Sequence, residues 1–257
     1  MAFLSMSPLF VCAQSTVLFQ EDFESGPGDF IIDNDYGIGS GLWHVSTSCK
    51  VPLAGHTQGG ALYYGQDDFC DYDIGIANRG VVDSPPIDLT SYDSGPIELR
   101  FKYYLEVELV NCRSLWDPDY GVDTDLATVE ISADGGYFTK IARNCWASGL
   151  IEFFSTPDGW TELMIDLSDY AGSVIQLRFG FNTVSNSQNY YDGFYVDDVI
   201  VYGPPCSYAI AGDINHDCVV DMADWVVMAD MEQLAAMVEN WLLNCRLTPS
   251  DPGCVPE

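Results

Sequence analysis

The stretch IELRFKYY, residues 97–104, decides the fold of most of this chain. Its side chains alternate between two sets, Ile97, Leu99, Phe101 and Tyr103 in one and Glu98, Arg100, Lys102 and Tyr104 in the other. A period of two is typical of a β-strand that has one buried face and one wet face. We therefore expect residues 97–104 to form a half-buried strand.

Two further stretches show the same alternation, ATVEIS at 127–132 and VIQLRFGF at 174–181. Turn-forming sequences separate such stretches, ADGG at 133–136, TPDG at 156–159 and SDYAG at 168–172. No segment with helical periodicity lies between them. This pattern predicts a mainly β domain, with antiparallel strands in two packed sheets.

Composition and charge limit the classes of function that this chain can have. The 257 residues include 47% hydrophobic ones, which is enough for a large core. Nine Lys and Arg oppose 39 Asp and Glu, giving a net charge of −30. Such a field repels phosphate backbones and attracts cations, so we exclude nucleic-acid binding. After the N-terminus, no apolar run approaches the ~20 residues of a membrane span.

Residues 1–13 are predicted to be a secretory signal peptide, because they are apolar and uncharged and place Val11 and Ala13 before a cleavage point. The alternative is a buried first strand. Cleavage would remove Cys12 and leave an even set: Cys49, Cys70, Cys112, Cys145, Cys206, Cys218, Cys245 and Cys254. Even numbers of cysteines behind a signal indicate disulfides, so we expect an extracellular or cell-surface protein.

The strand pattern ends at YGPPC, residues 202–206, because two prolines cannot continue a central strand. We place a domain boundary there, with the large domain at 17–203. The next stretch, GDINHDCVVDMAD at 212–224, carries oxygen-bearing side chains at EF-hand spacing. The predicted Ca²⁺ ligands are Asp213, Asn215, Asp217, the carbonyl of Val219, Asp221 and Asp224.

A helix-like run follows this loop at once, as EF-hand geometry requires. The alternative is a solvated acidic turn. Two positions depart from the EF-hand pattern: Asp224 replaces a bidentate Glu, and Cys218 replaces the glycine at the sharp turn. A disulfide would pin that turn, and Cys245 is the preferred partner of Cys218. The final residues, 246–257, are expected to be a loose tail.

An Asp at the last loop position makes this segment resemble the calcium segment of type I dockerins. We assign 206–245 to a small helical, dockerin-like module. The resemblance implies Ca²⁺-dependent attachment to a scaffold protein or a cell-surface component. Dockerins carry two such segments, and this chain has one DxNxD loop.

The large domain resembles MAM-type jelly rolls and their bacterial relatives. The resemblance rests on an ordered series of stretches: VLFQEDFESG, GLWHV, GGALYYG, VVDSPPIDLTS, IELRFKYYLEVE, DLATVEISADGG, WTELMIDLSDYAGSVIQLRFGFNT and DGFYVDDVIVYG. It implies a jelly-roll sandwich that serves as an extracellular, non-catalytic module for adhesion or for binding a glycan or protein. It also implies disulfides Cys49–Cys70 and Cys112–Cys145.

In such folds the first and last strands lie side by side. This arrangement would bring four carboxylates together: Asp22, Glu24, Asp197 and Asp198. The resemblance implies a second, structural Ca²⁺ there. The alternative is a solvated edge whose charge blocks sheet-to-sheet aggregation.

Aromatic side chains that lie in polar loops are the candidate glycan contacts: Trp116, Tyr120, Tyr190 and Tyr191. Tyrosines at strand spacing (Tyr63, Tyr64, Tyr103 and Tyr104) are expected to be core. An enzymatic alternative is a glycosidase-like unit of a polysaccharide-degrading system. It would use Glu106 and Glu108, which lie on one face of a strand, near the ~5–5.5 Å separation of retaining enzymes. His44 and His56 are expected to be packed or on the surface rather than catalytic.

Overall fold

The computed structural model describes residues 16–37, 39–92, 95–108, 125–145 and 148–204, and the backbone of 208–209 and 255–256. Several predicted features lie outside these residues and keep their standing as predictions: the signal peptide 1–13, Cys112, Trp116, Tyr120, Cys206, the loop 213–224, Cys218, Cys245 and Cys254. In the described part, the only helical element is the 3₁₀ turn η1 (Ser168–Tyr170). No helix there is long and apolar enough to cross a membrane.

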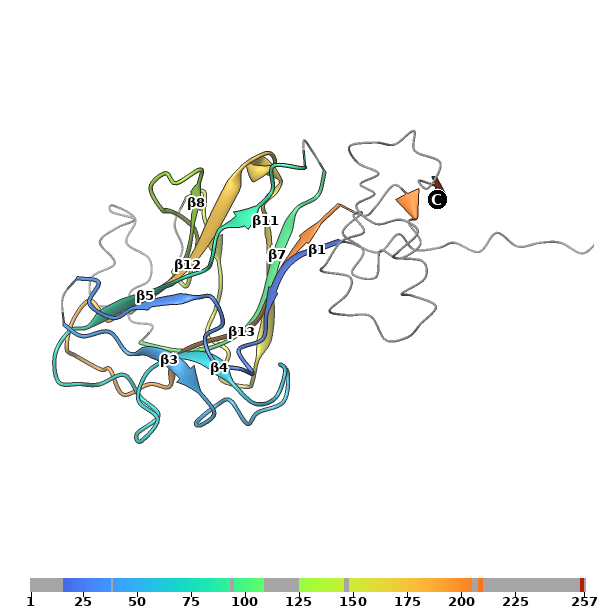
Figure 1. The fold of residues 1–257 in the computed structure, drawn as a ribbon. Coiled ribbons are helices and arrows are strands. Elements are labelled where there is room, and N and C mark those ends of the chain that lie inside the picture. Colours follow the sequence, from blue (N-terminus) through green and yellow to red (C-terminus); the bar gives the residue numbers. More distant parts are fainter. Residues whose placement is uncertain are drawn as a thin grey trace, which may run out of the picture. The chain divides into compact units, whose positions relative to one another are not determined.

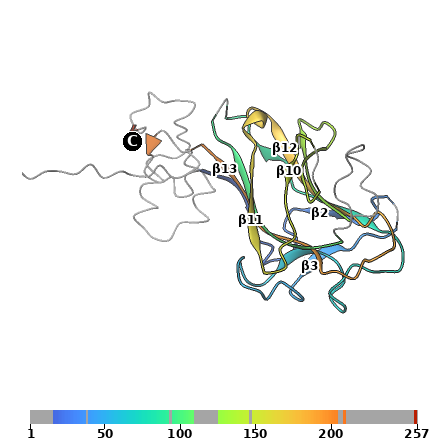
Figure 2. The same ribbon diagram turned by 180° about the vertical axis from the view of Figure 1, so that it is seen from behind.

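The described strands form two main sheets, seen in Figure 1 and from behind in Figure 2. The first sheet, sheet A, has the order β11-β7-β13-β4-β3, with β1 paired to β13. Its strands are β1 (Thr16–Glu21), β3 (Trp43–Ser46), β4 (Ala61–Tyr64), β7 (Glu98–Glu106), β11 (Thr161–Asp166) and β13 (Gly193–Gly203).

The second sheet, sheet B, has the order β10-β9-β8-β12-β5-β2, with β6 paired to β12. Its strands are β2 (Ile31–Asp33), β5 (Arg79–Asp83), β6 (Ile87–Asp88), β8 (Leu126–Ala133), β9 (Thr139–Arg143), β10 (Ile151–Glu152) and β12 (Val174–Asn182). The chain crosses repeatedly between the sheets, as in jelly rolls. One detail differs from the all-antiparallel prediction, because β10 runs parallel to β9.

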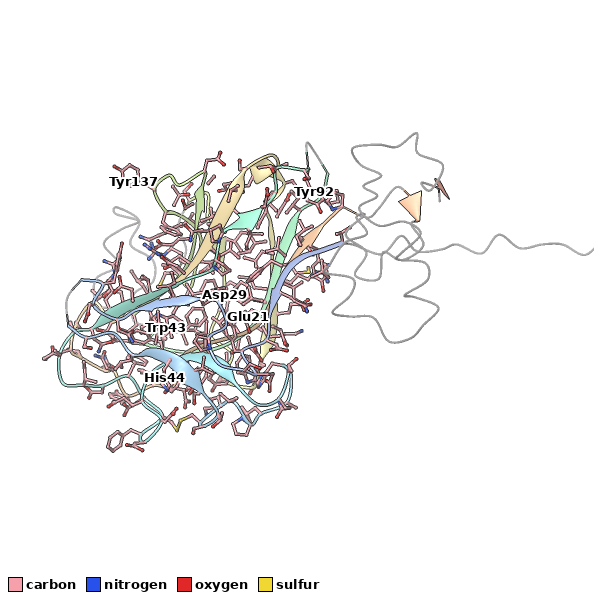
Figure 3. The ribbon with its side chains drawn as sticks, viewed as in Figure 1. Glu21, Asp29, Trp43, His44, Tyr92 and Tyr137 are labelled. Atoms are coloured by element: carbon pink, nitrogen blue, oxygen red, sulfur yellow. A yellow bond between two sulfur atoms is a disulfide. The ribbon has the colours of Figure 1, made fainter. Side chains whose placement is uncertain are left out.

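Apolar side chains from both sheets meet in one core. Leu99 and Phe101 enter it from β7, and Leu177 and Phe179 enter it from β12. The rings of Phe101 and Phe179 contact each other edge to face, with centroids 5.2 Å apart. Trp43 of β3 is 1% exposed and lies among these side chains (Figure 3). Each such burial contributes roughly 1.5–3 kcal/mol, so the predicted inner faces are also the main source of stability.

One predicted wet position is buried. Tyr104 is 1% exposed, although its neighbours along the outer face of β7 are polar. It packs edge to face against Tyr195, whose ring stacks on Tyr63 at 4.0 Å. Val51 belongs to the same small cluster, and Lys50 lies 5.4 Å from the Tyr104 ring centroid. The loop that follows β3 therefore covers this part of sheet A, which strand periodicity alone does not reveal.

Leu18–Tyr202 forms one compact unit, and the predicted large domain was 17–203. Beyond it, β14 (Tyr208–Ala209) pairs antiparallel with β15 (Val255–Pro256). The helical module predicted for 206–245 otherwise lies outside the described residues.

Candidate functional site

The predicted acidic edge forms where β1 lies beside β13. Asp22 and Glu24 follow β1 directly, and Asp197 and Asp198 lie within β13. Between Asp197 and Ile200, β13 contains one residue more than the facing segment of β7, and Asp198 has a φ of 47°. A bulge of this kind interrupts the alternation of side chains. Two consecutive carboxylates are thereby placed next to the end of β1.

Backbone N–H groups of the loop 56–60 hold two of these carboxylates. The N–H of Thr57 donates to Oδ2 of Asp198 at 3.0 Å, and that of Gly60 donates to Oε1 of Glu24 at 3.1 Å. Gly59 has a φ of +144°, and a Cβ there would overlap the Glu24 carboxylate. Glycine at this position lets Glu24 approach the loop.

Asp197 is the buried centre of this edge, with 0% exposure. Its Oδ2 lies 2.5 Å from Nδ1 of His56, while its Oδ1 has no hydrogen-bond partner. His56 is itself enclosed: its Nε2 lies 2.7 Å from the carbonyl of Val51, and its ring stacks on Trp160 at 3.9 Å. The histidine is thus packed, as predicted, and one carboxylate oxygen is buried without compensation.

Burial is the main cause that raises the pKa of Asp197 to about 8. The negative charges of Asp198, Glu24 and Asp22 raise this pKa further, and a backbone hydrogen bond from Asp198 lowers it. A carboxyl group in this position is relieved either by a proton or by a cation, since both remove the repulsion.

The donor chemistry suits a hard cation. Calcium prefers carboxylate and carbonyl oxygens in a flexible shell, and the orphaned Oδ1 of Asp197 is such an oxygen. A cavity of ≈ 280 Å³ lies at this edge, lined by Gln20, Glu21, Asp22, Thr57, Asp198 and Ile200. In the described part of the chain, no three His, Cys, Asp or Glu side chains converge as a complete metal-ligand set. A bound ion would therefore have to draw exposed Asp22 and Glu24 inward.

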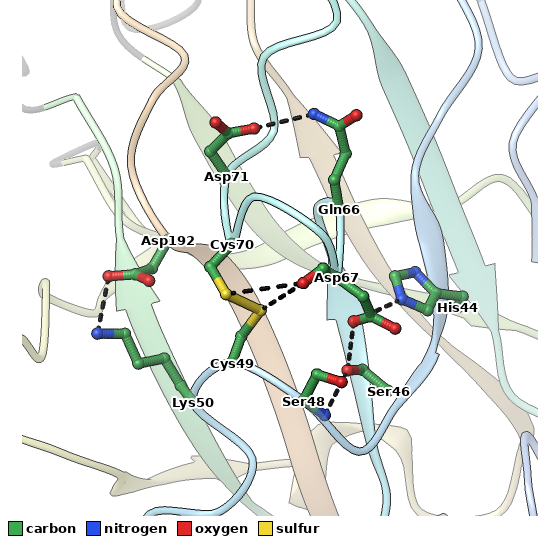
Figure 4. The surroundings of a disulfide bond; sticks show 10 residues. All are labelled: His44, Ser46, Ser48, Cys49, Lys50, Gln66, Asp67, Cys70, Asp71 and Asp192. Atoms are coloured by element: carbon green, nitrogen blue, oxygen red, sulfur yellow. Dashed lines mark hydrogen bonds and ion pairs between the residues drawn. A yellow bond between two sulfur atoms is a disulfide. The ribbon is translucent and has the colours of Figure 1, made fainter.

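A disulfide secures the loops at the β3–β4 end of sheet A (Figure 4). Cys49 and Cys70 are joined, with Cα atoms 5.5 Å apart, which is the pairing that the resemblance implied. Beside it, Asp67 accepts a hydrogen bond from Ser46 at 2.6 Å and contacts His44 Nε2 at 3.2 Å. Cys145 is also disulfide-bonded, and Cys112, the partner that the resemblance implied, lies outside the described residues.

Two of the four aromatic candidates can be placed. Tyr190 is 63% exposed and Tyr191 is half-buried, and their rings stack with centroids 5.1 Å apart. Trp116 and Tyr120 lie outside the described residues. The strand tyrosines Tyr63, Tyr64 and Tyr103 are buried, as expected, and so is Tyr104, which strand alternation alone had placed on the wet face. Tyr137 projects from the β8–β9 turn with 96% exposure and is not among the predicted glycan contacts (Figure 3).

Glu106 and Glu108 make separate sets of contacts. A hydrogen bond with Asp192 is the main cause that raises the pKa of Glu106, followed by burial, and Lys50 pairs with Asp192 at 3.0 Å. Glu108 is 2% exposed and accepts a hydrogen bond from Gln188 at 2.5 Å. Spacing along the strand had predicted a pair of glutamates, whereas the observed carboxyl pair is Glu106 with Asp192. Asp192 is far from Glu106 in the sequence, so spacing along the strand could not indicate this pair.

A second buried acid was also missed. Asp125 is 0% exposed and accepts a hydrogen bond from the hydroxyl of Tyr72 at 2.5 Å. Burial is the main cause that raises its pKa to about 7, the Tyr72 hydrogen bond lowers it, and the charge of Glu108 raises it. Nothing in the residues around position 125 distinguishes this Asp from the many exposed ones.

Comparisons with known proteins give distant structural likenesses only. No protein-family model matches the chain, and no curated protein matches it. The K3 cleaved adhesin domain of Lys-gingipain from Porphyromonas gingivalis W83 is 17% identical, with 72% of this chain and 98% of that domain covered and a TM-score of 0.42. TmCBM61, solved with β-1,4-galactotriose, is 13% identical, with coverages of 71% and 94% and a TM-score of 0.42.

TmCBM27, whose structure concerns mannan recognition, is 13% identical, with coverages of 74% and 99% and a TM-score of 0.35. Likenesses at this level carry no argument about ligand or mechanism. Membership of the MAM or dockerin families is not shown, so both resemblances stay predictions.

Proposed function

We propose that this chain is a secreted, non-catalytic binding or adhesion module whose sandwich domain is stabilised by Ca²⁺ at the β1–β13 edge. Its ligand would be a glycan or a protein. The observation that carries the proposal is the fully buried Asp197 with one oxygen unpartnered and three further carboxylates around it. A divalent cation would bind that oxygen and would also remove the repulsion among the four carboxylates. A surface salt bridge would not do both.

The C-terminal segment 206–245 adds attachment to this proposal. Its predicted ligands in the loop 213–224 would repel one another without a cation, so metal binding and folding are coupled there. The partner would be a scaffold protein or a cell-surface component. Ca²⁺ would then have two separate roles in one chain, one in the sandwich and one in the attachment segment.

A second candidate function is that of an accessory or catalytic unit in a polysaccharide-degrading system. It is favoured by the carboxyl pair of Glu106 and Asp192, since a raised pKa is typical of a general acid. Lys50 forms an ion pair with Asp192 and lies 5.4 Å from the centroid of the Tyr104 ring. Hydrolysis of a glycan that disappears in Glu106→Gln would establish the catalytic reading.

Calcium titration of the full chain tests the main proposal. Melting is followed by circular dichroism in EDTA and in Ca²⁺, and binding by calorimetry. An edge site held at 100 times its dissociation constant would stabilise the sandwich by about 3 kcal/mol, or roughly 5–12 °C. Asp197→Asn should abolish this shift, while Asp213→Asn should remove a different binding event and leave the sandwich shift in place.

Asp158→Asn, in an exposed turn, is the matched control and should behave as the parent protein. If Ca²⁺ leaves the sandwich melting temperature unchanged, the edge is a solvated acidic border and the calcium part of the proposal fails. A shift that survives in Asp197→Asn would place the ion elsewhere.

A further inference from the structure

Basic side chains, which are scarce in this chain, gather around one groove on sheet B. The whole sequence has only nine Lys and Arg, and its net charge is −30. Three of the nine line a groove of ≈ 240 Å³ on the outer face of the sheet. Its lining consists of Arg79, Val81, Leu126, Thr128, Glu130, Lys140, Arg143, Gly180, Phe181 and Asn182.

Strand register explains the shape of this groove. Across β5, β12 and β8, Val81, Gly180 and Thr128 lie directly opposite one another. Gly180 has no side chain, and a Cβ there would come within 2.6 Å of the Thr128 hydroxyl. The middle of the row is therefore a depression, with an apolar wall on one side and a hydroxyl on the other.

The row on one side of this depression is close to neutral. It contains alternating charges, because Arg178 lies opposite both Asp83 and Glu130, and Glu130 lies opposite Lys140. Arg178 donates two hydrogen bonds to Asp83, at 2.6 and 2.8 Å. This arginine is already engaged by a carboxylate and has little capacity left for an external anion.

The row on the other side has uncompensated positive charge. Arg79 lies opposite Asn182, and its guanidinium is 4.6 Å from the Tyr36 ring centroid. In the described part of the chain, Arg79 makes no ion pair. The ring fixes the guanidinium without using its N–H groups, which are free to donate.

We propose that this groove binds an acidic sugar within a mainly neutral glycan, with its carboxylate or sulfate on Arg79 and its hydroxyls on Asn182 and Thr128. The proposal rests on the proposed function and names its ligand class. Planar guanidinium groups suit both kinds of anion, and the volume is below the ~300–1,000 Å³ of drug-sized sites, which fits about one sugar ring.

The net negative charge of the protein limits the charge density of the glycans that the groove can bind. Screening limits electrostatic effects to about 8 Å in physiological salt, so a single anion in the groove responds chiefly to the local cations. A long polyanion such as heparin extends beyond this distance and meets the strongly acidic remainder of the surface. We therefore expect isolated acidic groups to be selected and dense polyanions to be rejected.

The test is a glycan array probed with the full chain in 150 mM salt, using matched pairs of oligosaccharides that differ by one uronate or one sulfate. Acidic members should bind at least tenfold more tightly than their neutral partners, and heparin should not bind. Uronate pairs and sulfate pairs are scored separately, which distinguishes the two anions. Arg79→Gln should abolish the preference within each pair.

Arg100→Gln is the matched control. Arg100 lies on sheet A and also faces a tyrosine ring, and its substitution removes the same charge as Arg79→Gln. It should bind as the parent protein does. Equal binding of neutral and acidic members would overturn the inference and leave the binding-module function standing. Tight heparin binding, or an unchanged preference in Arg79→Gln, would also overturn it.

If no glycan on the array binds, an NMR titration with glucuronate, galacturonate and glucose 6-sulfate decides the question. Shifts at the amides of Gly180 and Thr128 that are absent with glucose would support the groove. Absence of these shifts with all three anions would sink the inference, while protein ligands for the module would remain to be tested separately.

Discussion

Asp125 offers the sharpest test of how this fold handles its acidic composition. The group is fully buried, and its pKa is raised from 3.8 to about 7, mainly by burial. A raised pKa stabilises the folded state fully below pH 3.8, and this contribution is lost as pH rises through 7. Each pH unit in this window corresponds to about 1.4 kcal/mol, so the total is about 4 kcal/mol.

Asp125→Asn keeps the acceptor for the Tyr72 hydroxyl and removes the ionisation. In EDTA, the variant should be about as stable as the parent protein at pH 4 and about 3–4 kcal/mol more stable at pH 8. Urea unfolding at four pH values measures the difference, with Asp158→Asn as an exposed control. A difference that stays constant from pH 4 to pH 8 would show that Asp125 is not protonated by burial, and the reasoning would fail.

Three further outcomes follow from local geometry. Gly59→Ala should lower the free energy of unfolding by about 1–3 kcal/mol in urea titrations, because the residue has a φ of +144° and the new Cβ would overlap Glu24; an unchanged midpoint would contradict this. Replacing Cys49 and Cys70 together by Ser should cost about 3 kcal/mol by loop-closure entropy, measured by thermal melting. Tyr72→Phe should raise the pKa of Asp125, because the hydrogen bond from the Tyr72 hydroxyl lowers this pKa in the parent protein; the change would be visible as a shifted pH–stability curve.

Strand periodicity predicted much of the sandwich because the inner faces of β7, β8 and β12 carry uninterrupted apolar alternation. It failed at Tyr104, where residues near the disulfide cover the outer face. Burial there depends on a loop from another part of the chain, so no local pattern reports it. The parallel pairing of β10 was missed for a similar reason, since two residues are too few to show a period.

The acidic edge was predicted as a group of four residues, and the structure brings those residues next to one another. The part played by His56 was not foreseen, because its contact with Asp197 spans 141 positions. Arg79 was missed for a different reason. A lone arginine at the start of a strand is unremarkable until the register places it across from Asn182 beside Gly180.

Three carboxyl groups are buried within the described residues, Glu108, Asp125 and Asp197, and two of them have strongly raised pKa values. Their surroundings separate two ways of relieving a buried acid. Asp125 and Asp197 each have one oxygen in a hydrogen bond and one without a partner, but the charge of only one carboxylate, Glu108, raises the pKa of Asp125, so a proton suffices there. Asp197 is surrounded by other carboxylates, so a cation relieves all of them together. Adding Ca²⁺ at pH 8 should therefore reverse the effect of substitution at one site only. Asp197→Asn should become less stable than the parent protein, while Asp125→Asn stays more stable. Equal responses of the two variants to Ca²⁺ would mean that burial, and not the identity of the neighbouring groups, controls both sites.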